Sequence, residues 1–149
     1  MKVNLSKLLR AKLRVLLVGK PGLAKTARVL EAAREAGYRT VIFRTSLSER
    51  VDLGGCLVPD VAAGVTVALP LQLLADLKKA SDKVLVFLDD LGQAPMDVQA
   101  ATMSLFDKGT LPENVVIWGA TNRPGDKAGV TSLCEPLRSR FHVAFAIAS

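Results

Sequence analysis

The sequence is short of cysteine, histidine and long apolar runs, and each shortage excludes a class of protein. Its 149 residues include one His and two Cys, Cys56 and Cys134, which lie 78 positions apart. This spacing argues against a zinc site and against a disulfide-rich secreted module, and both thiols are predicted to be buried. The apolar run at residues 84–88 is far shorter than the roughly 20 residues that span a bilayer. Because Arg10 and Arg14 interrupt the N-terminal stretch that resembles a signal peptide, we expect a cytoplasmic protein without a membrane span.

The composition is typical of one folded, soluble domain. Hydrophobic residues make up 50% of the chain and charged residues 23%, with 11 Gly and 7 Pro, which argues against disorder and against repetitive sequence. A chain of this length can bury roughly 68–70% of its unfolded surface around one core. The single histidine, His142, stands between Phe141 and Val143, which predicts a half-buried strand residue rather than a catalytic base.

Charge is distributed unevenly along the chain. The net charge is +6, but residues 1–50 contain 12 Lys and Arg against three Glu, a balance of +9, whereas the remaining 99 residues balance at −3. Such asymmetry has two explanations, an anionic partner near the N-terminal half or complementary faces that stack subunits head to tail. Composition alone does not choose between them.

Short apolar runs alternate with amphipathic segments. Runs rich in Val, Leu and Ile predict buried strands, and apolar residues that repeat every three or four positions predict helices. The strands are expected at residues 13–18, 40–43, 84–88, 115–119 and 142–147, and the helices at 4–13, 26–36, 71–80, 95–109 and within 131–139. Apolar strands separated by helices indicate an α/β fold in which helices cover both faces of a parallel sheet.

A glycine-rich loop joins the first predicted strand to the helix that follows. It fits the pattern G-x-x-x-x-G-K-[ST], in which backbone N–H groups and a helix N-terminus surround a polyphosphate. The loop consists of Gly19, Lys20, Pro21, Gly22, Leu23, Ala24, Lys25 and Thr26. Lys25 supplies a mobile positive charge, and Thr26 offers a hydroxyl to magnesium. Ala24 replaces the second glycine, which we expect to be compatible with binding because the chain there is already helical.

Two carboxylates, Asp89 and Asp90, follow the apolar run at residues 84–88. The carboxyl ends of parallel strands form the usual ligand edge of an open α/β sheet. Asp89 is suited to hold the hydration shell of a magnesium ion, and Asp90 to orient an attacking water. A solvated turn would also explain such a pair, but the phosphate loop upstream favours the catalytic interpretation.

Further polar groups follow the strand predicted at residues 115–119 and the last predicted helix. The amide of Asn122 could hydrogen-bond the same water or the terminal phosphate, although an ordinary turn before Arg123 also explains it. Arg138 and Arg140 bracket the end of the last predicted helix. Arginine supplied by a neighbouring subunit can stabilise transition-state charge, and cations are also common at helix C-termini.

Together these motifs resemble the AAA+ ATPases, and the segments GKPGLAKT, LDD and ATNRP look most like the MoxR-type branch. The resemblance covers nearly the whole chain. It implies a three-layer αβα P-loop NTPase core with five parallel strands in the order 5-1-4-3-2. It also implies that ATP or ADP is bound with Mg²⁺. The nucleotide-binding residues would be Gly19, Lys20, Pro21, Gly22, Leu23, Ala24, Lys25, Thr26 and Ala27, with Thr26 and Asp89 as the metal residues.

The same resemblance implies catalytic roles and an assembly. Asp90 and Asn122 would be catalytic, with Asn122 as sensor 1, and Arg138 or Arg140 would be an arginine finger. The protein would be an ATPase that forms a ring, commonly a hexamer, and that uses hydrolysis to remodel a protein partner in a chaperone-like way.

Two features depart from the family pattern. The catalytic carboxylate is normally Glu, one methylene longer than Asp90, and a displacement of about 1 Å can cost on the order of 10²-fold in rate. Residues 1–149 are expected to be the nucleotide-binding core without the C-terminal helical lid, which makes weak activity the expectation. Residues 52–58 and 64–69 are similar to an insertion that faces the ring pore in MoxR-like proteins, and a β-hairpin that covers a sheet edge explains them equally well.

Two other functions stay open. The first is a nucleotide-gated interaction module that binds ATP but hydrolyses little of it, which Asp90 and the missing lid favour. The second is a nucleic-acid-associated ATPase that uses the basic N-terminal half, whose affinity would fall steeply with salt. No aromatic residues alternate with these basic residues to stack on bases, so the second is not favoured.

Overall fold

The computed structural model describes residues 4–20, 24–45, 56–69, 72–122 and 133–146. Its helices are α1 (Leu5–Arg10), α2 (Lys25–Ala36), α4 (Gln72–Lys78), α5 (Met96–Met103) and α6 (Glu135–Arg138), with short 3-10 turns η2 (Leu91–Gln93) and η3 (Ser104–Phe106). Its strands are β1 (Val15–Val18), β2 (Arg39–Arg44), β3 (Cys56–Asp60), β4 (Val65–Leu69), β5 (Val84–Asp89), β6 (Val115–Thr121) and β7 (Val143–Ala146). Within these ranges, every helix is too short or too polar to cross a membrane.

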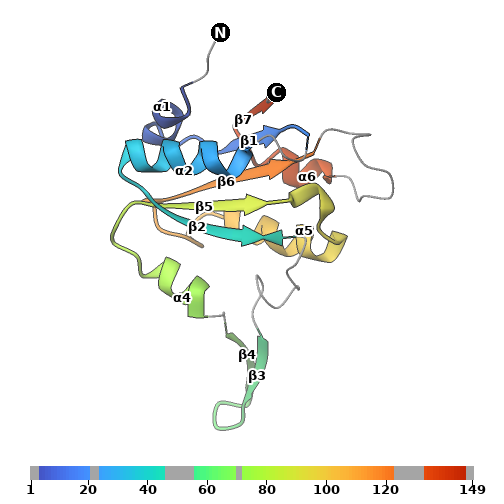
Figure 1. Ribbon diagram of the computed structural model, residues 1–149. Helices are drawn as coiled ribbons and strands as arrows, with labels where there is room; N and C mark the ends of the chain where they lie inside the picture. Colours follow the sequence, from blue (N-terminus) through green and yellow to red (C-terminus); the bar gives the residue numbers. More distant parts are fainter. Residues whose placement is uncertain (1–3, 21–23, 46–55, 70–71, 123–132, 147–149) are drawn as a thin grey trace.

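Five parallel strands form the central sheet in the order β2-β5-β6-β1-β7 (Figure 1). Numbered by their succession along the chain and read from β7, this is the order 5-1-4-3-2 that the family resemblance implied. Leu16 of β1 pairs with Gly119 of β6 on one side and with Ala144 of β7 on the other. Because the strands are parallel, β1, β5 and β6 all end at one edge, called here the carboxyl edge. Their first residues form the opposite, amino edge.

Helices cover both faces of this sheet, so the α/β prediction is confirmed (Figure 1). Successive side chains of a strand point to opposite faces. Leu85 and Phe87 of β5 therefore pack with α1 and α2, including Val29. Val86 and Leu88 pack on the other face with α4, α5 and α6. These β5 side chains are fully buried, and burying each one contributes roughly 1.5–3 kcal/mol.

Three local expectations differ from the structure. Pro95 is the N-cap of α5 rather than its first residue. His142 is exposed and precedes β7, so the prediction of a half-buried strand residue is wrong. The strand begins one residue later because the backbone N–H groups of His142 and Val143 share the Arg14 carbonyl oxygen. Cys134 is a half-buried N-cap of α6 rather than a buried thiol, and the side chain of Cys56 lies outside the described part.

Strands β3 and β4 form a separate antiparallel hairpin. Its turn contains Gly64 at φ +69°, a conformation that glycine adopts without strain. In Figure 1 the hairpin extends away from the five-stranded sheet. Within the described residues it pairs with neither β2 nor β7, so the structure favours a projecting hairpin over one that covers a sheet edge.

Candidate functional site

Three neighbouring strand ends bring the sequence motifs together at the carboxyl edge. Strand β1 leads into Gly19, β5 ends at Asp89, and β6 leads into Asn122. The backbone N–H of Gly19 donates to the Thr121 carbonyl oxygen at 3.1 Å, which ties the start of the glycine-rich loop to the end of β6. The loop, the acidic strand end and the amide-bearing strand end are therefore neighbours, as parallel strands require.

The Lys25 ammonium connects this loop to the neighbouring strand end. Lys25 is only 9% exposed, and its Nζ donates to the carbonyl oxygens of Gly19 (2.9 Å) and Lys20 (3.4 Å). It also donates to Oδ1 of Asn122 at 3.3 Å. A buried ammonium needs such partners, because an unpaired charge away from water is costly. All three acceptors are neutral, so they hold the positive charge in place without cancelling it.

Only one of the two polar groups of the Asn122 amide has a hydrogen-bond partner among the described residues. Its Oδ1 accepts the Lys25 hydrogen bond, but its Nδ2 is buried and has no hydrogen-bond partner within the described residues. Leaving a buried donor unpaired costs about 1–3 kcal/mol. A water molecule or a bound ligand can supply the acceptor that such a donor needs.

The carboxyl of Asp89 lacks full compensation for its negative charge. Partial burial and the neighbouring Asp90 charge raise its pKa, while the hydrogen bond from the Asp90 backbone N–H (3.0 Å) and the charges of Lys25 and Arg44 oppose that rise. Burial and a like charge both disfavour the ionised form, and an approaching cation would favour it. The position therefore suits a metal-associated carboxylate.

Strand β2 contributes two residues that lie outside the sequence motifs. Arg44 is the register partner of Asp89. Thr45 is fully buried, and its Oγ1 donates to the Asp89 carbonyl oxygen at 2.6 Å. Both follow the strand predicted at residues 40–43, so the rule that parallel strands end at one edge could have identified them.

Two residues of the site have positive φ although neither is glycine. Ala24, the N-cap of α2, has φ +53° and ψ +35°. The prediction that the chain is already in the right-handed helix at Ala24 is therefore wrong. This left-handed conformation costs a residue with a β-carbon roughly 1–2 kcal/mol, and glycine, which Ala24 replaces, avoids the cost. Asp90, the N-cap of η2, has φ +56° and is a residue type that tolerates this region better.

The other predicted nucleotide-binding residues follow from the same loop and helix. Thr26 is half-buried in the first turn of α2, and Ala27 and Lys20 are exposed. Pro21, Gly22 and Leu23 lie outside the described residues.

Arg138 and Arg140 are not part of this cluster. Helix α6 ends at Arg138, and the chain then leads to His142, whose backbone N–H donates to the Arg14 carbonyl oxygen at the start of β1. The segment with Arg140 thus runs toward the amino edge. Arg138 is half-buried, Arg140 is exposed, and neither forms an ion pair with a carboxylate in the described ranges.

Gln99 of α5 links the segment after Asp90 to the start of α6. It is fully buried, its Nε2 donates to the Ala94 carbonyl oxygen at 3.1 Å, and its Oε1 accepts from the Cys134 backbone N–H at 2.9 Å. No sequence pattern marks this role, because a glutamine on an amphipathic helix is usually assigned to the solvent face.

Comparisons with known proteins agree with this geometry. Residues 15–149 match the model of the ATPase family associated with various cellular activities (AAA). No curated protein matches the chain. The Thermotoga maritima RuvB Holliday junction branch migration motor is 24% identical with a TM-score of 0.64, over 96% of this chain and 42% of that one. A Cytophaga hutchinsonii protein provisionally named an ATPase is 20% identical with a TM-score of 0.61, over 97% of this chain and 44% of that one. The chain thus spans less than half of these structures, and the likeness shows the fold.

Proposed function

The chain belongs to the AAA family of ATPases, and we propose that its carboxyl edge binds ATP with Mg²⁺ and hydrolyses the bond between the β- and γ-phosphates. The observation that carries this proposal is the hydrogen bond from Lys25 to Asn122, residues 97 positions apart, beside the Asp89 carboxylate. A cation that can bind phosphate, an amide that can bind the terminal phosphate and a carboxylate that can hold a metal ion thus lie at the same site.

The residues fit Mg²⁺-ATP in two respects. Within the described residues the buried Nδ2 of Asn122 lacks an acceptor, which a phosphate oxygen would supply, and partial burial raises the pKa of Asp89, so a bound cation would favour its ionised form. Among the described residues, no group of three or more His, Cys, Asp or Glu could hold a metal ion alone. Magnesium in phosphoryl-transfer sites usually has only one or two protein ligands, and here Thr26 and Asp89 would hold it. When bound, it neutralises charge on the transferred phosphoryl group.

Phosphate binding requires Lys25 to exchange partners. Its Nζ would leave the carbonyl oxygen of Gly19 and the amide of Asn122 for phosphate oxygens, which make stronger, charge-assisted hydrogen bonds. Ala24 has no side chain that bonds the first N–H groups of α2. These N–H groups and the positive end of the helix dipole are thus directed at the phosphates.

Hydrolysis would draw on groups from both edges of the sheet. Asp90 orients the attacking water, and Asn122 donates a hydrogen bond from Nδ2 to that water or to the γ-phosphate. Arg138 or Arg140 would stabilise the transition state in trans, and the segment with Arg140 runs toward the amino edge, away from the phosphate site of its own subunit. When subunits meet head to tail, an arginine at one edge of a subunit lies beside the phosphate site at the other edge of its neighbour.

We further propose that the protein is a MoxR-like subunit of a ring, commonly a hexamer, that remodels a protein partner. Two observations support this assembly. The segment with Arg140 runs toward the amino edge, away from the Lys25 site, which suits a head-to-tail contact between subunits. The hairpin of β3 and β4 projects from the sheet and is available to a partner (Figure 1).

A second candidate function is a nucleotide-gated interaction module with little hydrolysis. Asp90 is one methylene shorter than the family's glutamate, and it caps η2 in a left-handed conformation. Both features limit where its carboxylate can reach. In this function ATP binding alone would switch the partner-binding state.

Isothermal titration with ATP and Mg²⁺ tests the binding step. Wild type should bind, and Lys25→Ala should weaken binding at least tenfold, because a charge-assisted hydrogen bond contributes about 1.5–3 kcal/mol. Lys79→Ala removes the same charge from an exposed position after α4 and should bind as wild type. Equal affinities for wild type and Lys25→Ala would contradict the proposal.

Phosphate release at saturating ATP separates the two candidate functions. A wild type that turns over, with loss of activity in Asp90→Asn, supports the ATPase. Negligible turnover by a wild type that binds ATP, with turnover gained in Asp90→Glu, supports the interaction module.

A further inference from the structure

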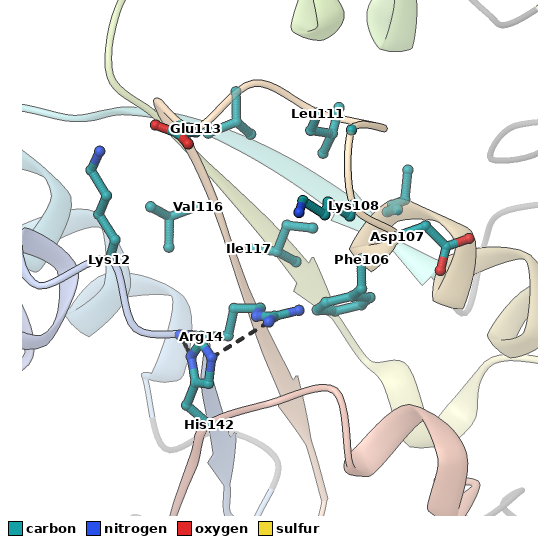
Figure 2. A pocket seen from close by; sticks show the side chains of 13 residues that line it. Lys12, Arg14, Phe106, Asp107, Lys108, Leu111, Glu113, Val116, Ile117 and His142 are labelled. Atoms are coloured by element: carbon teal, nitrogen blue, oxygen red, sulfur yellow. Dashed lines mark hydrogen bonds between the residues drawn. The ribbon is translucent and has the colours of Figure 1, made fainter.

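A cavity of about 340 Å³ lies at the amino edge of the sheet, away from Lys25 (Figure 2). Its volume falls within the range of roughly 300–1,000 Å³ that is usual for small-molecule sites. Strand β6 forms its floor, and its walls are the segment after α5 and the residues around the start of β1. The lining residues that matter here are Arg14, Phe106, Lys108, Ile117 and His142.

His142 and Arg14 present two unmatched donors at this cavity. Nδ1 of His142 accepts a hydrogen bond from the Arg14 backbone N–H at 2.9 Å. In a neutral imidazole the proton is then on the other nitrogen, Nε2. Nε2 lies 3.4 Å from Nη2 of the Arg14 guanidinium, which can only donate. Two donors cannot bond each other, so both need an acceptor oxygen, and the described residues place none between them.

The charges around the cavity favour a negatively charged acceptor. Partial desolvation and the Arg14 charge lower the pKa of His142, so its ring is neutral at pH 7. The other ionisable residues that line the cavity are Lys12, Lys108, Asp107 and Glu113. No ion pair joins any of them to another described residue. In Figure 2 the Asp107 carboxylate points away from Arg14 and His142, which leaves the cations uncompensated there.

An apolar surface adjoins the two donors. The guanidinium carbon of Arg14 lies 5.5 Å from the centroid of the Phe106 ring, a cation–π contact that holds both groups. Phe141 packs edge-on against Phe106, with centroids 5.2 Å apart and ring planes at 73°. Ile117 on β6 and Leu111 extend the apolar lining. A ligand with a charged oxygen could thus place an apolar group beside it.

We propose that this cavity binds a small organic anion, whose carboxylate or phosphate oxygen lies between Arg14 and His142 and whose apolar part lies against Phe106 and Ile117. The oxygen accepts from Nε2–H of His142 and from the Arg14 guanidinium at once, and Lys108 adds a second positive charge. The site is separate from the ATP site at the carboxyl edge, and its occupation requires neither ATP nor Lys25.

The single histidine makes a direct test available by NMR. The Cε1–H resonance of His142 in the full chain would be followed at pH 7 during titration with benzoate and, separately, with phenyl phosphate. At least one of the two should give a saturable shift, and the response to each shows whether carboxylate or phosphate is taken. Benzyl alcohol should give no shift, and inorganic phosphate should bind at least tenfold more weakly. A bound anion should also raise the pKa of His142, because it favours the imidazolium.

Two matched variants test the donor pair. Arg14→Met keeps the backbone N–H that orients the ring and removes the guanidinium, so binding should weaken at least tenfold. Arg34→Met removes the same charge from the exposed face of α2, where Arg34 pairs with Glu31, and should leave binding unchanged. Lys25→Ala should also leave binding unchanged even if it abolishes ATP binding, so this proposal and the ATPase proposal fail independently.

Three results would overturn the proposal. They are the absence of a saturable shift with both organic anions, equal weakening by Arg14→Met and Arg34→Met, and inorganic phosphate binding as tightly as phenyl phosphate. If the amide spectrum shows that Arg14→Met is unfolded, Lys108→Met on the exposed turn after η3 replaces it. Weaker binding by Lys108→Met would support the site, and unchanged binding would overturn it.

Discussion

The two edges of the five-stranded sheet differ in how their cations are held. At the carboxyl edge, Lys25 is buried and donates to three neutral oxygens, two from the loop and one from Asn122. At the amino edge, Arg14 faces another donor, Nε2 of His142, and Lys108 is exposed without a carboxylate partner in the described chain. The carboxyl edge satisfies its cation internally, and the amino edge does not.

This difference shows that an anion meets different obstacles at the two edges. ATP bound as proposed would have to displace the internal partners of Lys25 before it gains its own, so part of the binding free energy would go into that exchange. The Oδ1 of Asn122 would then lose its hydrogen bond from Lys25. At the amino edge no internal hydrogen bond of Arg14 and His142 needs to break, and an anion only adds an acceptor. The carboxyl edge is therefore suited to a change of hydrogen-bond partners on binding. The amino edge is suited to binding an anion without such a change.

The largest effect is expected when the arginine finger is removed from one subunit and the phosphate-binding lysine from another. Of Arg138→Ala and Arg140→Ala, the variant that removes the arginine finger should lower kcat by about 10³-fold or more, with ATP binding retained. Lys25→Ala should bind ATP at least tenfold more weakly and release little phosphate by itself. A mixture of Lys25→Ala with the finger variant should regain phosphate release, because the intact arginine of one subunit then faces the intact phosphate site of the other.

Size-exclusion chromatography of the mixture provides the control for that experiment. If the two variants assemble together and phosphate release does not recover, the arginines do not act across a subunit contact. The opposite-edge arrangement would then have no role in catalysis.

A smaller effect, on stability, is expected at the carboxyl edge itself. A β-carbon added at Gly92, just after Asp90, would collide with Oγ1 of the buried Thr121. Overpacking of this kind costs about 1–3 kcal/mol, so Gly92→Ala should lower the urea midpoint. Thr121→Ala removes that oxygen, and the double variant should regain part of the loss. Strictly additive losses would show that the added β-carbon does not collide with the Thr121 hydroxyl.

The sequence predicts the carboxyl edge better than the amino edge for a physical reason. Lys25, Asp89 and Asn122 each follow an apolar run, and parallel pairing brings the ends of such runs together. The pairing of Arg14 with His142 joins residues 128 positions apart at strand beginnings, where no local pattern reports the contact. The strand order was implied by the family resemblance, because periodicity identifies strands but not their neighbours.

The left-handed backbone at Ala24 could not be predicted from the sequence, and it leads to a prediction of an intermediate effect on stability. Ala24→Gly relieves the left-handed strain, which exceeds the entropy that glycine loses, so the free energy of unfolding should rise by about 0.5–1 kcal/mol. Ala27→Gly makes the same change three residues later in right-handed helix and should lower it by about 0.5–1 kcal/mol. Urea denaturation of both variants measures the two signs. Equal destabilisation by both would contradict the left-handed assignment.

The smallest effect concerns the charge of Asp89. Its raised pKa means that the folded protein holds this proton more tightly than the unfolded chain, so ionisation of Asp89 opposes folding. That cost begins as pH rises through the unfolded value, about 3.9, is complete above the folded pKa, and persists at pH 7. Asp89→Asn removes the charge and keeps an Oδ1 acceptor for the Asp90 N–H.

Thermal melts of Asp89→Asn without nucleotide should therefore show a slightly higher Tm than wild type at pH 7, with the difference vanishing in acid. The exposed Glu113→Gln serves as the control for loss of one negative charge. With ATP and Mg²⁺ present the order should reverse, because only wild type gains stability from the bound ion. A wild type that is the more stable at pH 7 without ligand would mean that the Asp89 carboxylate is already compensated at this edge, and the prediction that a bound cation is needed to stabilise it would be wrong.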